Sequence, residues 1–163
     1  MIELLDFTTE DYGNIYAFMR PLWLTTYGEI LPTEQIEFLL GKYFSKEGLA
    51  HYRALGYRYR KIGEIGVLVM VEKEKEIYID KLYLLPSARG MGIPREIFQE
   101  LQKSGKDLTL NVNRANERAV KCYLKNGFQI ERETEILLDN GMINCDYEMR
   151  LKTKKIAVAI CLL

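Results

Sequence analysis

Ser87-Ala88-Arg89-Gly90-Met91-Gly92-Ile93-Pro94 is the stretch around which the rest of the sequence is arranged. It follows a strand-like apolar run, residues 76–85, and precedes a helical pattern of apolar residues. A strand, a glycine loop and a helix in this order turn backbone N–H groups and the positive end of a helix dipole toward one spot, which suits a phosphate. Gly90 and Gly92 carry no Cβ atom, and the guanidinium fork of Arg89 matches phosphate oxygens. The stretch therefore predicts a fold that mixes helices and strands, and an anion site at this loop is one interpretation of it.

The same pattern also fits an ordinary strand-to-helix turn. It is not a P-loop, because no Gly-Lys-Ser/Thr follows, and it is a poor dinucleotide fingerprint, because Arg95 stands three positions after Gly92. On this loop alone, the anion site and the plain turn are equally open.

Composition narrows the class of protein. Of 163 residues, 48% are hydrophobic, and 23 basic side chains balance 23 acidic ones, so we expect a globular domain that does not bind nucleic acid. The three cysteines, Cys122, Cys145 and Cys161, have no metal-site spacing and leave one thiol over in any disulfide scheme. We therefore expect no metal and a reducing, cytoplasmic location.

The two ends of the chain give weaker signals. The N-terminus begins with a strand-like run and has no pattern typical of a signal peptide. The last residues, 152–163, form an apolar tail whose eight consecutive apolar residues fall short of the roughly 20 that span a bilayer. We expect no membrane contact, and a tail that serves as an edge strand or as a subunit contact in a homodimer.

The periodicity predicts the order of the elements. Helices are expected after a cap at Thr8 or Thr9, with Pro21 bending or ending the first one, then from Pro32 and from Ser45. Period-two patterns predict strands from Tyr57 onward, and Asp139-Asn140-Gly141 reads as a hairpin turn. We expect an α/β (α+β) fold: a mixed, mostly antiparallel central sheet with helices on both faces. A helix joins strand 76–85 to strand 107–112, so these two should be parallel.

A second group of residues lies about 25 positions after the loop. Asn116, Ala119 and Tyr123 follow one another at helical spacing, so they share one stripe along a helix. From Asn116 to Tyr123 this stripe is about 10 Å long. A long ligand could lie along this stripe and reach the phenol. Alternatively, Asn116 is only a helix cap, and Ala119 and Tyr123 pack on the sheet.

Together, the two groups resemble the GCN5-related N-acetyltransferase (GNAT) family. Arg89-Gly90-Met91-Gly92-Ile93 resembles the family loop for the pyrophosphate of acetyl-CoA, although Pro94 stands where a Gly or Ala is usual and lacks an N–H. Residues 110–112, followed by Asn116, Ala119, Tyr123 and Gly127-Phe128, resemble a second family motif, and residues 79–86 resemble the strand beside the pantetheine arm. The resemblance covers residues 2–151, which we expect to be one acetyltransferase domain.

The resemblance implies an N-acetyltransferase that moves an acetyl group from acetyl-CoA to the amine of a small molecule or a peptide. Tyr123 would be the general acid, and the general base stays open between Asp80, Glu29, Glu64 and a water chain. The residues implied in binding acetyl-CoA are Leu82, Tyr83, Leu84, Arg89, Gly90, Met91, Gly92, Ile93, Pro94, Asn116 and Ala119. Aromatic residues that could line an amine pocket are Tyr12, Tyr16, Trp23, Tyr27, Tyr57 and Tyr59. The alternative is a non-catalytic acyl-CoA sensor or a protein-interaction domain on the same fold.

Overall fold

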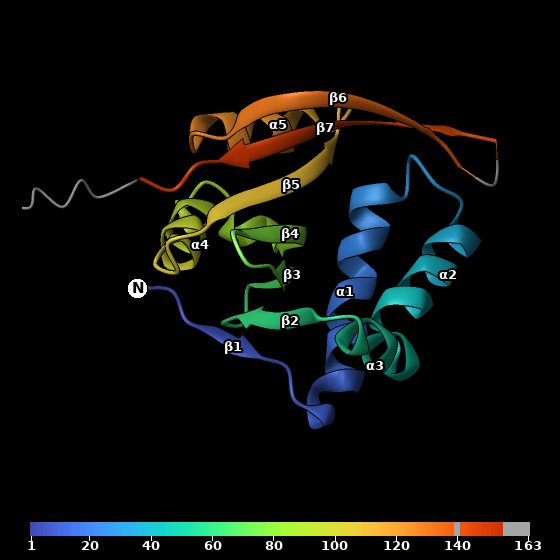
Figure 1. Ribbon diagram of the computed structural model, residues 1–163. Helices are drawn as coiled ribbons and strands as arrows, with labels where there is room; N and C mark the ends of the chain where they lie inside the picture. The colour runs from blue at the N-terminus through green and yellow to red at the C-terminus, as the bar shows by residue number, and fades with distance from the viewer. Residues whose placement is uncertain (139–140, 155–163) are drawn as a thin grey trace, which may run out of the picture. The chain divides into compact units, whose positions relative to one another are not determined.

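The computed structural model describes residues 1–138 and 141–154 (Figure 1). The strands are β1 (Leu4–Asp6), β2 (Tyr57–Ile62), β3 (Gly66–Glu72), β4 (Glu76–Leu84), β5 (Asp107–Asn113), β6 (Gln129–Leu137) and β7 (Ile143–Leu151). The helices are α1 (Tyr12–Tyr27), α2 (Thr33–Phe44), α3 (Lys46–Ala54), α4 (Ile93–Gln102) and α5 (Glu117–Lys125), with short 3-10 turns η1 (Thr9–Asp11) and η2 (Pro86–Ala88).

The seven strands follow the order β1-β2-β3-β4-β5-β7-β6. Strand β4 pairs with β5 in parallel, Glu76 opposite Asp107 and Ile79 opposite Leu110, whereas β5–β7, β6–β7, β1–β2 and β2–β3 are antiparallel. The expected mixed, mostly antiparallel sheet is confirmed. So is the parallel pair, because helix α4 carries the chain between its two strands.

The chain divides into two compact units. The first contains Met1–Glu72 and Lys81–Met91, and the second contains Lys73–Asp80 and the described residues from Gly92 onward. The boundary crosses β4 after Asp80 and crosses the glycine loop after Met91.

The first unit has an apolar core between its three helices and its strands. The apolar faces of α1, α2 and α3 meet β2 and β3, and the helices lie together in Figure 1. Because residues three and four apart share a helix face, each helix brings a row of large apolar side chains to this core. The buried set is Phe7, Ile15, Met19, Leu22, Trp23, Ile36, Leu40, Phe44, Leu49, Tyr59, Val67 and Val69.

Helix α1 begins later than predicted, and of the two effects predicted for Pro21 the end of the helix does not occur. It begins at Tyr12, after the turn η1, and runs through Pro21 to Tyr27 without ending there. Proline costs a helix one hydrogen bond, but burial of the neighbouring Leu22 and Trp23, both 4% exposed, offsets that cost. The tertiary core therefore overrides the local signal.

In the second unit, β5 turns one face to a core and the other to solvent. Leu108, Leu110 and Val112 alternate with more exposed residues along β5, and Met149 of β7 lies opposite Leu110. Arg150 ties β7 to three other strands, since it donates to Glu131 of β6, Asp107 of β5 and Glu76 of β4 at 2.8, 3.2 and 3.0 Å.

Some expectations lie outside the described residues. These are Asp139-Asn140 of the predicted hairpin turn and residues 155–163 of the apolar tail.

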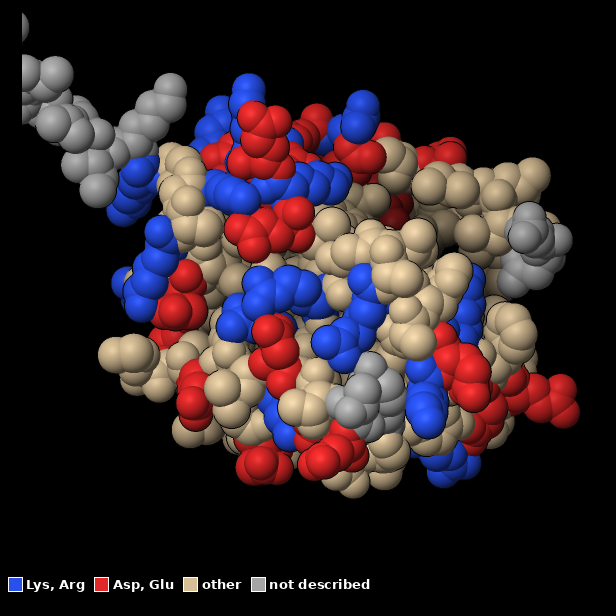
Figure 2. Space-filling model, turned by 60° about the horizontal axis from the view of Figure 1, so that its bottom comes forward, with Lys and Arg blue, Asp and Glu red and all other residues tan. Residues whose placement is uncertain are grey.

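None of the helices within residues 1–138 and 141–154 is long and apolar enough to cross a membrane. In that same part of the chain, no three His, Cys, Asp or Glu side chains gather as they would to hold a metal ion. Basic and acidic side chains are interspersed over the face shown in Figure 2.

Candidate functional site

The glycine loop needs its two glycines for their backbone conformation. Arg89 is extended, Gly90 and Gly92 both have φ of +75°, and Gly92 is the N-cap of α4. A positive φ is strained for any residue with a Cβ atom, so the turn requires both glycines. Among the described residues, no atom lies within 4 Å of where a Cβ of Gly90 or Gly92 would stand. The loop therefore borders open space on that side.

The hydrogen bonds that anchor this loop use the N–H groups of Leu85 and Arg89 and not those of the glycines. Leu85 N–H donates to Ile65 O at 2.8 Å, and Arg89 N–H donates to Pro86 O at 3.2 Å, which anchors the turn η2 before the loop. By contrast, the N–H groups of Gly90, Met91 and Gly92 donate to no acceptor within residues 1–138 and 141–154. Consecutive unpaired N–H groups at a helix N-terminus form an anion-binding concavity.

Pro94 takes the second position of α4, next to Ile93 at the first. Proline is tolerated there because the N–H of a first-turn residue has no partner inside the helix. An anion at this helix end therefore meets one donor fewer than a non-proline sequence would offer.

The end of β4 lies tightly against β3 in the first unit. Leu82, Tyr83 and Leu84 are half-buried. A Cβ atom on Gly66 of β3 would stand 2.4 Å from Tyr83 O and 2.7 Å from Leu84 Cδ2, so Gly66 is required for this close approach. The end of β4, which the family resemblance assigns to acetyl-CoA binding, is thus held in place by its close packing against β3.

An aromatic cluster covers the side chain of Tyr83. The Trp23 ring lies 5.1 Å from that of Tyr27 and 5.8 Å from that of Tyr83, and the two tyrosine hydroxyls are 2.9 Å apart. Burial raises the pKa of Tyr27. Lys81 Nζ lies 3.9 Å from the centroid of the Tyr43 ring, which is a cation–π contact.

The cluster only partly matches the aromatic residues singled out from the sequence. Trp23 and Tyr59 are buried in the core, at 4% and 3% exposure, so packing accounts for them. Tyr16 instead donates to Glu37 at 2.9 Å. Sequence reasoning missed Tyr43, and it named Tyr83 only for acetyl-CoA binding, because no periodic signal links residues of α2 and β4.

In the second unit, helix α5 carries the second motif. Asn116 is its N-cap, and its side-chain oxygen accepts from Ala119 N–H at 3.2 Å, as the cap interpretation predicted. The ring of Tyr123 lies 6.2 Å from that of Phe98 and 5.5 Å from that of Phe128. Asn116 therefore caps the helix and Tyr123 packs on neighbouring rings, as the alternative interpretation expected. Asn116 is nevertheless exposed, and Tyr123 is partly exposed.

The surroundings of two other reactive side chains, those of Cys122 and His51, argue against a catalytic role. Burial raises the pKa of the Cys122 thiol, which keeps it protonated at neutral pH and unsuited to act as a nucleophile. His51 is exposed on α3, where its ring lies 5.2 Å from that of Tyr52, as expected for a surface histidine.

Each unit therefore groups one set of the residues that sequence analysis named. The first unit holds Leu82, Tyr83, Leu84, Arg89, Gly90 and Met91. The second unit holds Gly92, Ile93, Pro94, Asn116, Ala119 and Tyr123.

Two solved structures share this fold. The PaiA N-acetyltransferase from Thermoplasma acidophilum, in complex with coenzyme A, superimposes with a TM-score of 0.67 at 25% identity over 93% of this chain and 99% of that one. The spermidine N-acetyltransferase from Vibrio cholerae, in complex with CoA and spermine, gives a TM-score of 0.63 at 17% identity over 93% of this chain and 95% of that one.

Sequence comparison agrees with the fold. A stretch of 59 residues, 36% of this chain, is 36% identical to the peptidyl-lysine N-acetyltransferase YjaB of Escherichia coli (strain K12) and spans 40% of that protein's length. The model of the acetyltransferase (GNAT) family matches residues 15–128, which include the glycine loop, β4 and all of α5. The chain therefore belongs to the acetyltransferase (GNAT) family.

Proposed function

We propose that this protein is an acetyl-CoA-dependent N-acetyltransferase that acts on a primary amine. The observation that carries the proposal is the row of N–H groups of Gly90, Met91 and Gly92 before α4, next to Arg89, which have no acceptor in the described part of the chain. That arrangement suits the pyrophosphate of acetyl-CoA, because phosphate oxygens accept from several N–H groups at once. The relatives are N-acetyltransferases, and both of the solved structures described above hold coenzyme A.

The remaining cofactor contacts follow the two motifs. Leu82, Tyr83 and Leu84 would bind the pantetheine arm through their backbone, and Asn116 would add its amide donor, which the cap interaction leaves free. Ala119 would give the arm room, since its small side chain is half-buried on the same stripe. Ile93 and Pro94 would contact the pyrophosphate region, with Pro94 contributing no hydrogen bond.

The chemical step would be direct attack of the amine nitrogen on the thioester carbonyl. A C–N bond forms and the C–S bond breaks, the amine loses a proton, and the departing thiolate gains one. A phenol has a pKa of about 10, close enough to that of a thiol for Tyr123 to supply this proton. The Leu82 N–H is our choice of donor to the oxyanion, and Asp80, two residues earlier on β4, is our choice of base.

The acceptor is an amine in both relatives whose substrate class is named. YjaB is a peptidyl-lysine N-acetyltransferase, and the Vibrio cholerae structure is of a spermidine N-acetyltransferase. We propose either a lysine side chain or a polyamine for this chain, since both present a primary alkyl ammonium. Residues 1–151 would act as one catalytic domain, in a reducing cytoplasm that suits the free Cys122 and Cys145, and as a homodimer.

The decisive experiment is a calorimetric titration of the full chain with acetyl-CoA and, in parallel, with CoA. We expect binding in the micromolar range, about −8 kcal/mol. Arg89→Gln should weaken it about 10- to 100-fold, because one charge-assisted phosphate contact is lost. Arg95→Gln, at an exposed arginine in the first turn of the same helix, is the matched control and should change the affinity by less than about twofold.

The outcomes separate the alternatives. Micromolar binding followed by acetylation of spermidine or of a lysine peptide supports the enzyme. Binding without turnover of any amine would point to the acyl-CoA sensor. If the wild-type protein binds neither acetyl-CoA nor CoA, the catalytic proposal fails and an interaction domain on this fold is left.

A further inference from the structure

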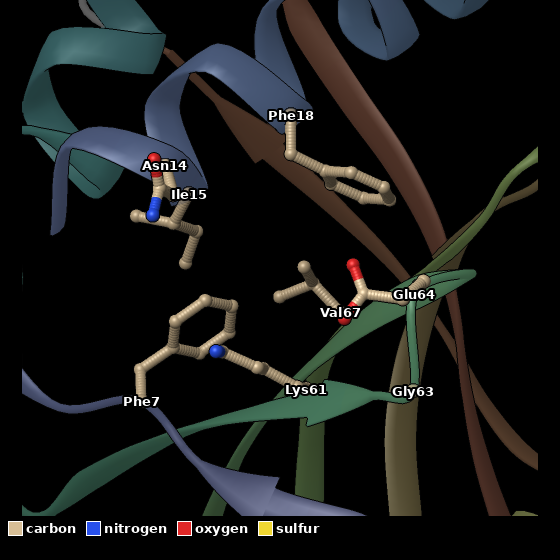
Figure 3. Close-up of a pocket in the computed structure, with 9 residues that line it drawn as sticks. Phe7, Asn14, Ile15, Phe18, Lys61, Gly63, Glu64 and Val67 are labelled. Atoms are coloured by element: carbon tan, nitrogen blue, oxygen red, sulfur yellow. The ribbon is translucent and has the colours of Figure 1, made fainter. Parts of the chain in front are cut away.

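A pocket of about 290 Å³ lies within the first unit, where the end of β1, the start of α1 and the β2–β3 turn meet (Figure 3). Its floor is apolar and buried, formed by Phe7, Ile15 and Val67, with Phe18 on one wall. Asn14, Lys61 and Glu64 bring polar groups to it. The pocket is at the small end of the range for ligand sites, and its mixture of an apolar floor with a few polar groups is typical of them.

The positive charge of the pocket is already neutralised. Lys61 Nζ donates to Asp11 Oδ1 at 2.6 Å and lies 5.4 Å from the centroid of the Phe7 ring. The other Asp11 oxygen accepts from Thr8 N–H and Thr8 Oγ1, each at 2.8 Å. Lys61 is therefore held at the wall of the pocket by its own carboxylate, and an anionic ligand gains little there.

The negative charge is not neutralised. Glu64 stands in the β2–β3 turn, and its carboxylate is directed toward the apolar side chains in Figure 3. Within residues 1–138 and 141–154, no hydrogen-bond donor or cation pairs with this carboxylate. A ligand cation would thus meet an unpaired carboxylate next to two phenyl rings, Phe7 and Phe18, whose faces also attract cations.

We propose that this pocket binds a small organic ammonium ion, with the ammonium group against Glu64 and an apolar body on Phe7, Phe18, Ile15 and Val67. The ammonium donates a charge-assisted hydrogen bond to Glu64, and burial of the apolar body supplies the rest of the affinity. Asn14 at the rim can accept a further hydrogen bond from the same group. This site shares no residue with the segments assigned to acetyl-CoA, and it does not depend on the proposed acetyl transfer.

The backbone behind the pocket links it to β4. Gly66 lines the pocket and is also the residue whose Cβ would stand 2.4 Å from Tyr83 O. Ile65, next to it, accepts from Leu85 N–H at 2.8 Å. An occupant therefore lies on the strand that supports the end of β4, although binding itself requires none of the β4 residues.

The test uses the ¹⁵N-labelled full chain without acetyl-CoA, titrated at pH 7 with 2-phenylethylamine, which is an ammonium ion at that pH. We expect shifts of the backbone N–H signals of Gly63, Glu64, Gly66 and Val67 that saturate with one affinity. The neutral analogue 2-phenylethanol has nearly the same shape, so it measures the charge contribution on the unaltered protein. We expect it to bind about tenfold more weakly.

Variants locate the site. Glu64→Gln should weaken binding of 2-phenylethylamine about tenfold, and Asn14→Trp, at an exposed rim position, should block it. Glu74→Gln, in the exposed β3–β4 turn, is the matched control and should leave the affinity within about twofold.

Three results would overturn the proposal: no shifts in the pocket, equal affinity for the amine and the alcohol, or equal affinity in Glu64→Gln. Shifts confined to the aromatic cluster around Trp23 would also overturn it, since the amine would then bind elsewhere. Because acetyl-CoA is absent, a negative result leaves the acetyl-CoA titration unaffected.

Discussion

Helix α2 of the first unit and helix α5 of the second are held by different forces. In α2, Ile36, Leu40 and Phe44 are completely buried. In α5, every residue keeps part of its surface exposed, and the helix depends on its ends. Asn116 caps its start, and at its other end Phe128 N–H donates to Tyr123 O at 3.1 Å beyond the left-handed Gly127.

The difference shows which of the two helices leaves its side chains accessible. A helix that is stabilised by core packing buries one row of its side chains in that core. Most substitutions that preserve volume are tolerated at such buried positions. A helix that is stabilised by caps can leave Asn116, Ala119 and Tyr123 on an accessible stripe. The accessible helix is therefore the one that carries a recognisable motif.

The largest effect expected from this comparison is on the stability of the first unit. Phe44→Ala should lower the free energy of unfolding by about 3–5 kcal/mol, because it leaves a cavity in the core. Phe38 on the same helix is 69% exposed, so Phe38→Ala should stay within about 0.5 kcal/mol. Urea denaturation measures both. Similar losses in the two variants would mean that α2 is not held by its buried face.

Tyr123→Phe tests the accessible helix through activity. We expect kcat for acetylation to fall about 100-fold or more, because the proton donor to the thiolate is lost. The Kd for acetyl-CoA and the unfolding midpoint should barely change, since the ring still packs on Phe98 and Phe128. Tyr147→Phe on β7 is the control. An unchanged kcat would leave Tyr123 with a packing role alone.

Asn116 caps α5 and is proposed to bind acetyl-CoA, and two variants separate these roles. Asn116→Ala removes the cap and should cost about 1 kcal/mol of stability as well as affinity for acetyl-CoA. Asn116→Asp keeps the cap oxygen but loses the amide donor, so stability should be kept while the Kd for acetyl-CoA rises. Thermal unfolding measures the change in stability, and calorimetry measures the change in the Kd for acetyl-CoA. Retained affinity in Asn116→Asp would restrict the residue to capping.

The smallest effect concerns the ion pair between Asp11 and Lys61 in the first unit. Hydrogen bonds from Lys61 and Thr8 lower the pKa of Asp11 from 3.8 to about 2. Since the folded pKa is the lower one, ionised Asp11 favours the folded state; that contribution is complete above pH 3.8 and disappears as the pH falls through 2. A carboxyl ¹³C NMR titration checks the value, and Lys61→Met should move it back up. Titration of wild-type Asp11 in its ordinary range would show that the pair does not form in solution.

Much of the fold was predictable because its signals are local. Alternation marks β5, Gly90 and Gly92 mark the loop, and Asn116 marks the start of α5, each by a preference that acts within a few residues. Of the two effects predicted for Pro21, a bend or an end of the helix, the end does not occur, and the helix continues because the neighbouring Leu22 and Trp23 are buried in the core. A core contact of that kind has no signature in the neighbouring sequence.

The sequence by itself determined the order of the elements, the parallel β4–β5 pair and the motifs that place the chain in its family, since these depend on periodicity, handedness and short-range turn chemistry. Only the tertiary structure decided which side chains meet. The hydroxyls of Tyr27 and Tyr83 meet across 56 positions of the sequence. Around one pocket, Glu64 meets Phe7 and Phe18, which lie 57 and 46 positions before it. Such contacts form only when separate helices and strands bury their apolar faces together, so no local pattern contains them.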